Sequence, residues 1–208
     1  MNRLGFLVLA AGLLGPGSVA ASGPAAEGVA TVLTNEFGPL TRASPRGRLE
    51  PVRLYFRGSA SRSEFKGGNG ETLAFAAPPG SAAGWLTDGA AVIPLPGAGH
   101  PLVVDPGDPC AGKGLFADCR KIAEVTYAGR PAHHWRYRLA NNVGPGRTRS
   151  GEMWLDAETG LVLRYRGQGG LGPVKEWRVE QVDYGPVPDT LFDVPAGAEH
   201  DGTPYNPG

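Results

Sequence analysis

The stretch GEMWLDAETGLVLRYRG, residues 151–167, alternates in polarity, turns at AETG and then alternates again. Met153 and Leu155 share one face of the first arm, and the other face carries Glu152, Trp154 and Asp156. Gly160 stands where a type I turn closed by a bulge requires a left-handed residue. The pattern predicts a β-hairpin with one apolar face.

The return arm and the stretch after it extend this pattern. Leu161, Leu163 and Tyr165 share one face of the return arm, and the opposite face carries Val162, Arg164 and Arg166. In the next stretch, KEWRVEQVDYG, the apolar phase changes between Val179 and Val182. This change predicts a bulge near Glu180 or Gln181, and because bulges bend sheets we expect strong curvature.

Short strand-like stretches recur along the rest of the chain, beginning with GVATVLTNEF at 28–37 and PVRLYFRG at 51–58. Turn dipeptides such as Asn69-Gly70 and Asp88-Gly89 separate them. We find no helical periodicity longer than two turns after the N-terminal segment. The sequence therefore predicts a mainly β fold over residues 28–197: a single curved antiparallel sheet, a half-barrel of about ten short strands with few or no helices. Residues 198–208 are expected to form a polar C-terminal tail.

The N-terminal segment MNRLGFLVLAAGLLGPGSVAASG has one cation, Arg3, before an apolar run that is followed by small residues. This layout is typical of a secretory signal peptide, here residues 1–21, with cleavage near Ala20-Ala21. An uncleaved anchor is the alternative. The run is shorter than the roughly 20 apolar residues that spanning a bilayer needs. We expect a periplasmic or secreted protein with no transmembrane segment.

The chain has 20 Lys and Arg against 20 Asp and Glu, which gives no electrostatic reason to expect a nucleic-acid partner. Many of the cations nevertheless fall on predicted strands: Arg53, Arg57, Arg62, Arg136, Arg138, Arg164, Arg166 and Arg178. They fit either a solvated outer face with cross-strand ion pairs or a surface for a head group or protein partner.

Cys110 and Cys119 are the only cysteines, spaced C-x8-C. Two cysteines this close in an oxidising compartment usually pair, so the sequence predicts a structural disulfide. A redox pair would favour C-x-x-C spacing beside a helix start, and two free thiols remain the other alternative.

No catalytic or metal-binding constellation is legible in the sequence. His133 and His134 are adjacent on a predicted strand, so they point to opposite faces and do not share one ion. Asp105 and Asp108 loosely resemble a calcium loop, but the terminal bidentate glutamate is missing. No serine stands in a G-x-S-x-G elbow. We predict no catalytic residue, no metal and no cofactor, and therefore no enzyme.

Several motifs together resemble one protein family. The strand type VRLYFRGSASRSEF at 52–65 is followed by YAGRPAHHWRYRL at 127–139, then W-L-D-x-x-T-G-L-x-L-R at 154–164 and L-F-x-V-P-x-G at 191–197. This set is similar to the periplasmic lipoprotein-carrier (LolA/LolB-like) superfamily, in a helix-poor branch. The resemblance implies a half-barrel whose concave face holds acyl chains, lipids or lipopeptides. The chain departs from the carriers in lacking an amphipathic N-terminal helix and a lipidation cysteine.

The apolar side chains expected to line the groove of such a sheet are Leu54, Phe56, Phe75, Trp85, Trp135, Tyr137, Met153, Leu155, Leu163, Tyr165 and Trp177. The alternative is that they fill an ordinary core. We interpret the chain as a non-enzymatic, monomeric protein that binds an apolar ligand, with a lipid or an acylated protein as partner. The second interpretation is an envelope interaction or sensor module that uses a sheet face or edge without a small ligand.

Overall fold

The structure is a computed structural model that describes residues 26–37, 47–78, 84–95, 102–139, 141 and 143–193. The signal peptide expected at 1–21 and the polar tail expected at 198–208 lie outside these residues. All elements named below belong to the described part of the chain.

A single open antiparallel sheet dominates the fold, in the order β6-β5-β4-β3-β2-β1-β11-β10-β9-β8-β7. The expected mainly β, curved antiparallel sheet is confirmed, with eleven strands where about ten were predicted. Its strands are β1 (Glu27–Thr34), β2 (Glu50–Arg57), β3 (Ala60–Lys66), β4 (Thr72–Ala77), β5 (Gly84–Thr87), β6 (Val92–Leu95), β7 (Asp118–Tyr127), β8 (Arg130–Arg138), β9 (Ser150–Asp156), β10 (Val162–Gln168) and β11 (Lys175–Tyr184). Two short 3-10 helices, η1 (Pro145–Arg147) and η2 (Asp189–Leu191), complete the described elements.

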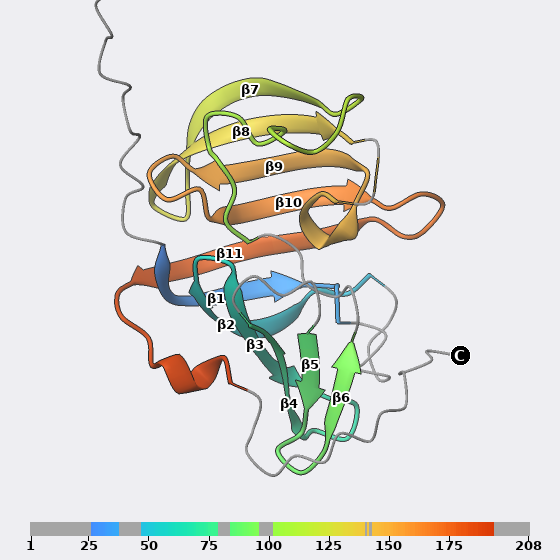
Figure 1. Ribbon diagram of the computed structural model, residues 1–208, viewed down its shortest axis with the longest axis vertical. Helices are drawn as coiled ribbons and strands as arrows, with labels where there is room; N and C mark the ends of the chain where they lie inside the picture. Colours follow the sequence, from blue (N-terminus) through green and yellow to red (C-terminus); the bar gives the residue numbers. More distant parts are fainter. Residues whose placement is uncertain are drawn as a thin grey trace, which may run out of the picture.

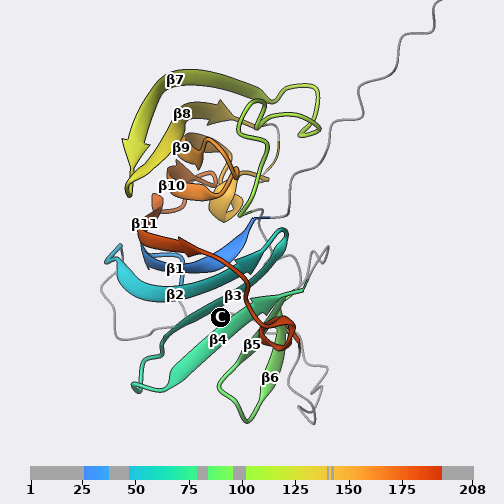
Figure 2. The same cartoon turned by 90° about the vertical axis from the view of Figure 1, so that its left-hand side faces the viewer.

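The sheet consists of two meanders joined by the pairing of β1 with β11. β1 to β6 form one half and β7 to β11 form the other, below and above the joint in Figure 1. Figure 2 shows the sheet curling from β7 at one edge to β6 at the other, which leaves the sheet open. The connection from β6 to β7 therefore runs from one edge to the other, and Val103 forms a bridge with Leu161 on the way.

The concave face of the sheet carries the core. Alternation places Val52, Leu54 and Phe56 of β2 inside, at 2% exposure or less, while Arg53 between them is exposed. The predicted bulge is present in β11: Thr31 pairs with Gln181 and Val32 with Val179, which leaves Glu180 as the extra residue. This extra residue explains the phase change in the sequence and supports the curvature.

The hairpin predicted at 151–167 consists of β9 and β10, and its predicted turn is confirmed. Gly160 has φ +73°, and Met153 and Leu155 are buried on the same face. Two assignments were wrong. A register shift between Val162 and Arg164 places Val162 opposite Leu155, so that it is buried rather than on the outer face. Asp156, expected outside beside Trp154, is fully buried in a polar network described below.

The predicted disulfide joins Cys110 to Cys119, with 5.7 Å between the two Cα atoms. It ties the end of the long β6–β7 connection to the second residue of β7. The cross-link therefore holds a loop against an edge strand and does not pass through the sheet.

Candidate functional site

The structure brings ten of the eleven predicted groove residues into one buried cluster: Leu54, Phe56, Phe75, Trp135, Tyr137, Met153, Leu155, Leu163, Tyr165 and Trp177. Trp85 is the exception and corrects the prediction. Phe75 and Leu86 are paired across β4 and β5 and both are buried, so Trp85, the neighbour of Leu86, faces the opposite side of the sheet. Trp85 therefore does not line a groove on the concave face.

Most of the remaining ten are packed into the core. Leu54, Phe56, Leu155 and Leu163 have no exposed surface, so no ligand reaches them without displacing other side chains. Phe75 and Trp177 line a cavity on the concave face. Tyr137 borders a hollow of about 480 Å³ whose other lining residues, among them Arg136 and Glu152, come from β7, β8 and β9. The predicted groove is therefore filled along most of its length and open at one place.

The open place is a cavity of about 180 Å³ between the β3–β6 half of the sheet, β11 and η1. Its described lining consists of Glu36, Phe37, Ser61, Ser63, Phe75, Leu95, Leu102, Gly146, Arg147, Lys175 and Trp177. Five of these side chains are large and apolar, and the three charged ones are Glu36, Arg147 and Lys175. An apolar cavity of about 150 Å³ is large enough to take benzene, so this one has room for one apolar group or chain end.

Two small residues on β3 account for the space. Ser61 and Ser63 point inward, paired with Phe56 and Leu54 of β2 on one side. At these two positions the neighbouring strand β2 places Phe56 and Leu54 on the concave face, whereas β3 places two hydroxymethyl groups. The unfilled space lies next to Phe75 of β4, the residue that pairs with Ser63 of β3.

The η1 segment closes one side of the cavity. Gly144, Pro145 and Gly146 are buried, and Arg147 donates its backbone N–H to the oxygen of Gly144 at 2.9 Å. Gly146 has φ +62°, and a Cβ there would overlap the hydroxyl of Tyr165, so glycine is required. Arg147 follows with φ +57°, an uncommon conformation for a residue with a side chain. The tight turn brings the Arg147 side chain to the cavity.

The charged groups at the cavity are held in different ways. Lys175 donates from Nζ to the carbonyl oxygen of Gly146 at 2.7 Å, which fixes the ammonium group beside η1. Burial raises the pKa of Tyr165 well above its usual value, and the nearby charge and hydrogen bond of Glu36 raise it further. Tyr165 is therefore neutral at physiological pH and bonds to Glu36 beneath Gly146.

A much smaller void of about 10 Å³ lies between the disulfide and η1, against Tyr137 and Met153. Tyr137 bonds through its hydroxyl to Thr148, whose Oγ1 donates to Pro145 at 2.6 Å. Burial raises the pKa of Tyr137 to about 12. The void is at or below the size that holds one water, so it is packing space rather than a binding site.

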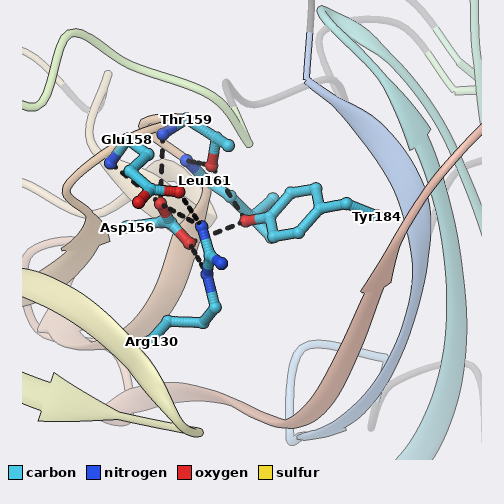
Figure 3. Close-up of polar contacts among 6 residues, drawn as sticks. All are labelled: Arg130, Asp156, Glu158, Thr159, Leu161 and Tyr184. Atoms are coloured by element: carbon cyan, nitrogen blue, oxygen red, sulfur yellow. Dashed lines mark hydrogen bonds and ion pairs between the residues drawn. The ribbon is translucent and has the colours of Figure 1, made fainter.

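Asp156 is the centre of the densest polar network in the described residues (Figure 3). Its Oδ2 accepts hydrogen bonds from Arg130 Nε at 2.8 Å and from Tyr184 at 2.9 Å. Its Oδ1 accepts the backbone N–H groups of Glu158 at 2.9 Å and Thr159 at 3.0 Å. Burial alone would raise the pKa of Asp156, but these bonds hold it below its usual value. Each oxygen accepts at least two hydrogen bonds, so the carboxylate holds the hairpin turn against β8 and β11. No acceptor position is left on it for a substrate or a transferred proton.

The two histidines are also accounted for locally. His133 bonds through Nδ1 to the carbonyl oxygen of Pro106 at 2.9 Å, while His134 stacks on Trp154 and contacts Glu152. They face opposite sides of the sheet, as predicted. Among the residues that the structure describes, no three His, Cys, Asp or Glu side chains are grouped to hold a metal ion.

Both edges of the sheet are poorly suited to accept another strand. β7 has a register shift between Lys121 and Ala123 and carries exposed charges. β6 is four residues long and contains Pro94. Bulges, charges, prolines and short length are the features that prevent edge-to-edge pairing. The alternative function as a module that grips a partner by strand addition gains no support from these edges.

Sequence reasoning found Phe75 and Trp177 but missed most of the cavity lining. The inward serines of β3 were visible as small residues in an alternating strand, and G-P-G followed by Arg147 was visible as a tight turn beside a cation. No sequence pattern predicted the contact between η1 and β11, which brings these distant stretches together.

No protein-family model matches the sequence, and no curated protein matches it. Three solved structures illustrate the similarity of the fold. An uncharacterized conserved protein from Thermus thermophilus has a TM-score of 0.50 at 15% identity, covering 83% of this chain and 88% of that one. A crystal structure of MucB has a TM-score of 0.47 at 17% identity, and the match covers 83% of this chain but only 58% of MucB.

A LolA superfamily protein from Nitrosomonas europaea is also among the structural neighbours, with a TM-score of 0.37, 9% identity and coverage of 82% of this chain and 90% of that one. At these identities the comparisons describe the fold alone. Within the described residues, no helix has the length and apolar character needed to cross a bilayer.

Proposed function

We propose that this chain is a binding protein that takes one apolar chain or group into the cavity between β3, β4, β6, β11 and η1. The observation that carries the proposal is the cavity itself, about 180 Å³ of space walled by Phe37, Phe75, Leu95, Leu102 and Trp177. A pocket with mainly apolar walls and a few polar groups is the usual form of a small-molecule site. The volume suits a single chain end better than a whole two-chain lipid.

The charges at the cavity favour an amphiphile with an anionic head. Lys175 Nζ is fixed beside η1, and the exposed Arg147 side chain reaches the same lining. Among the described residues Arg147 has no ion pair, so its charge is available to a ligand carboxylate or phosphate. Glu36 bonds to Tyr165 on the inner side of the turn, which keeps its charge engaged within the protein. A fatty acid or monoacyl phospholipid has both the apolar chain and the anionic head.

The Cys110–Cys119 disulfide supports a site of action outside the cytoplasm, because such bonds persist in oxidising compartments. The role proposed is binding rather than catalysis, since the most elaborate polar network, around Asp156, is saturated by its own partners. A periplasmic or secreted carrier or receptor for acyl chains fits both features.

The proposal is tested by titrating a fluorescent long-chain fatty acid into the protein and into two matched variants. Ser63→Phe fills the cavity from β3 and is expected to weaken binding at least about tenfold, because the ring occupies the space of the chain. Thr72→Phe adds the same ring at an exposed position of β4 and is expected to leave the affinity unchanged. Equal affinity in all three proteins contradicts the proposed site.

The role of the head group is tested in the same assay. The Arg147→Met and Lys175→Met variants are expected to bind a fatty acid more weakly, by about fivefold each, while binding of the fatty alcohol of equal chain length stays the same. A parallel loss for the acid and the alcohol would show that the two cations hold the cavity together and do not select the ligand.

A further inference from the structure

The exposed large apolar side chains of the protein are gathered mainly at one end of the upper half of the sheet. Leu115 and Phe116 are 97% and 82% exposed, and Leu171 is fully exposed. Val143 and Val174 are exposed to 37%. Of the large hydrophobics exposed in the described residues, only Ile122, on edge strand β7, lies elsewhere.

Three segments carry these side chains, and their contacts make them one surface, which we call the loop end: residues 110–117, 141–149 without the undescribed 142, and 166–175. Arg149 donates its N–H to the oxygen of Gln168 at 2.7 Å, which joins the second segment to the third. Lys113 and Val143 line one small void together, which places the disulfide loop against the second segment. Figure 1 shows these loops together at the right-hand ends of β7 to β11.

The loop end carries an excess of cations, although the whole chain is neutral. Its three segments contain Lys113, Arg147, Arg149, Arg166 and Lys175 and no Asp or Glu. The acids that adjoin it are Asp118 and Glu176, which follow the first and third segments, and Glu152, which with Glu176 lies opposite Arg166 in the sheet register. Within the described part of the chain, none of these five side chains forms an ion pair. Five unpaired cations around protruding apolar side chains are the composition that binds an anionic bilayer surface, through charge attraction and shallow insertion of the apolar tips.

We propose that the loop end docks this protein on an anionic lipid bilayer, with Leu115, Phe116 and Leu171 inserted at the level of the head groups. The apolar tips stand on two loops, Leu115 and Phe116 on one and Leu171 on the other, and are largely exposed, so they are suited to a deformable surface rather than to a pocket of fixed shape. The disulfide stiffens the loop that carries Leu115 and Phe116. Arg147 and Lys175 belong both to the loop end and to the cavity lining, so docking would bring the cavity close to the membrane. The docking itself needs no occupied cavity and stands independently of the proposed ligand.

The direct test places a tryptophan at a loop tip and measures its quenching by brominated lipids in vesicles of phosphatidylglycerol and phosphatidylcholine. Phe116→Trp is expected to be quenched by vesicles that contain phosphatidylglycerol and much less by phosphatidylcholine alone. Ile122→Trp is the control, because residue 122 is exposed on β7 outside the loop end. Both variants share the N-terminal segment and the four native tryptophans, so their difference reports on the loop tip. Equal quenching at 116 and 122, or none at either, overturns the proposal.

Co-sedimentation with the same vesicles measures the contribution of each chemistry. The triple variant Lys113→Gln, Arg149→Gln, Arg166→Gln is expected to weaken partitioning about 100-fold, since each cation near an anionic surface contributes about fivefold. Leu115→Ser with Phe116→Ser is expected to weaken it at least about tenfold, whereas Ile122→Ser leaves it unchanged. An undiminished affinity in both loop-end variants, with the fold intact by circular dichroism, contradicts docking through this surface.

Discussion

The two halves of the sheet use the same concave face in different ways. Across β8, β9 and β10 the inward positions are filled by large side chains such as Trp135, Met153 and Leu163, and the space is closed. Across β3 the inward positions 61 and 63 are serines, and the space opposite Trp177 stays open. Curvature is common to both halves, so curvature alone does not make a binding groove. The volume of the inward side chains decides where one opens.

The largest effect is expected in the filled half. Leu155→Ala removes a side chain with no exposed surface and should lower the free energy of unfolding by about 4 kcal/mol. Trp154 directly precedes Leu155 and lies half-buried on the outer face. Trp154→Ala should lower the free energy of unfolding by only about 1 kcal/mol, because it loses the stacking on His134. Denaturant unfolding of both variants measures the difference. A greater loss in Trp154→Ala would mean that the faces of β9 are assigned the wrong way round.

The Asp156 network should come next. Arg130→Met leaves a buried carboxylate without its cation and is expected to cost about 3 kcal/mol at pH 7. The pKa of Asp156 in the folded protein is below its usual value, so the stabilisation is present above about pH 4 and is lost as the pH falls further. The difference in stability between wild type and variant should therefore shrink on acidification. Thermal unfolding from pH 7 to pH 3 measures it, and a constant difference would contradict the role of the charge.

A comparison of two glycines with positive φ distinguishes the cost of the backbone conformation from the cost of steric overlap. Gly160 has φ +73° and Gly170 has φ +89°, but only at Gly160 would a Cβ meet the protein, at the carbonyl oxygen of Val104. Gly170→Ala should cost about 1 kcal/mol through the backbone angle alone. Gly160→Ala should cost about 2–3 kcal/mol, because the long β6–β7 connection must also move away. Similar losses of stability in the two variants would show that the β6–β7 connection does not pack closely against the hairpin turn.

The smallest change in stability is expected where the sheet is open. Ser63→Phe adds a ring to existing space, so its free energy of unfolding should lie within about 1 kcal/mol of wild type. The same ring introduced at Ala132, which is buried in the filled half at 2% exposure, should cost about 1–3 kcal/mol or more. Chemical denaturation of Ser63→Phe and Ala132→Phe compares the two halves directly. Equal destabilisation would mean that the cavity does not exist in solution.

Local patterns predicted much of the fold. The alternation in GEMWLDAETGLVLRYRG, the left-handed Gly160 and the phase change near Glu180 each depend on neighbours in the sequence, and each was found. The errors arose where distant residues decide the outcome. Asp156 alternates as an outer residue, but Arg130 and Tyr184 satisfy its charge inside. Val162 was misplaced because a register shift in β10 is not visible in its composition.

The candidate site was less predictable for the same reason. Listing large apolar side chains identified the core, since those residues fill space. A cavity is marked by small residues between large ones, and Ser61 and Ser63 are ordinary strand residues until β11 and η1 are placed against them. Trp85 shows the opposite error, because its size suggested the groove while its phase relative to Leu86 put it on the other face.

The central claim is that the open half of the concave face holds an apolar chain. A crystal of the protein soaked with a fatty acid that carries bromine on its terminal carbon tests it most directly, through the anomalous signal of the bromine. We predict one strong bromine peak between Phe75 and Trp177, with the carboxylate near Arg147 and Lys175. A peak among the side chains of β8 to β10, or no peak in the cavity at a saturating concentration of the acid, would contradict the account.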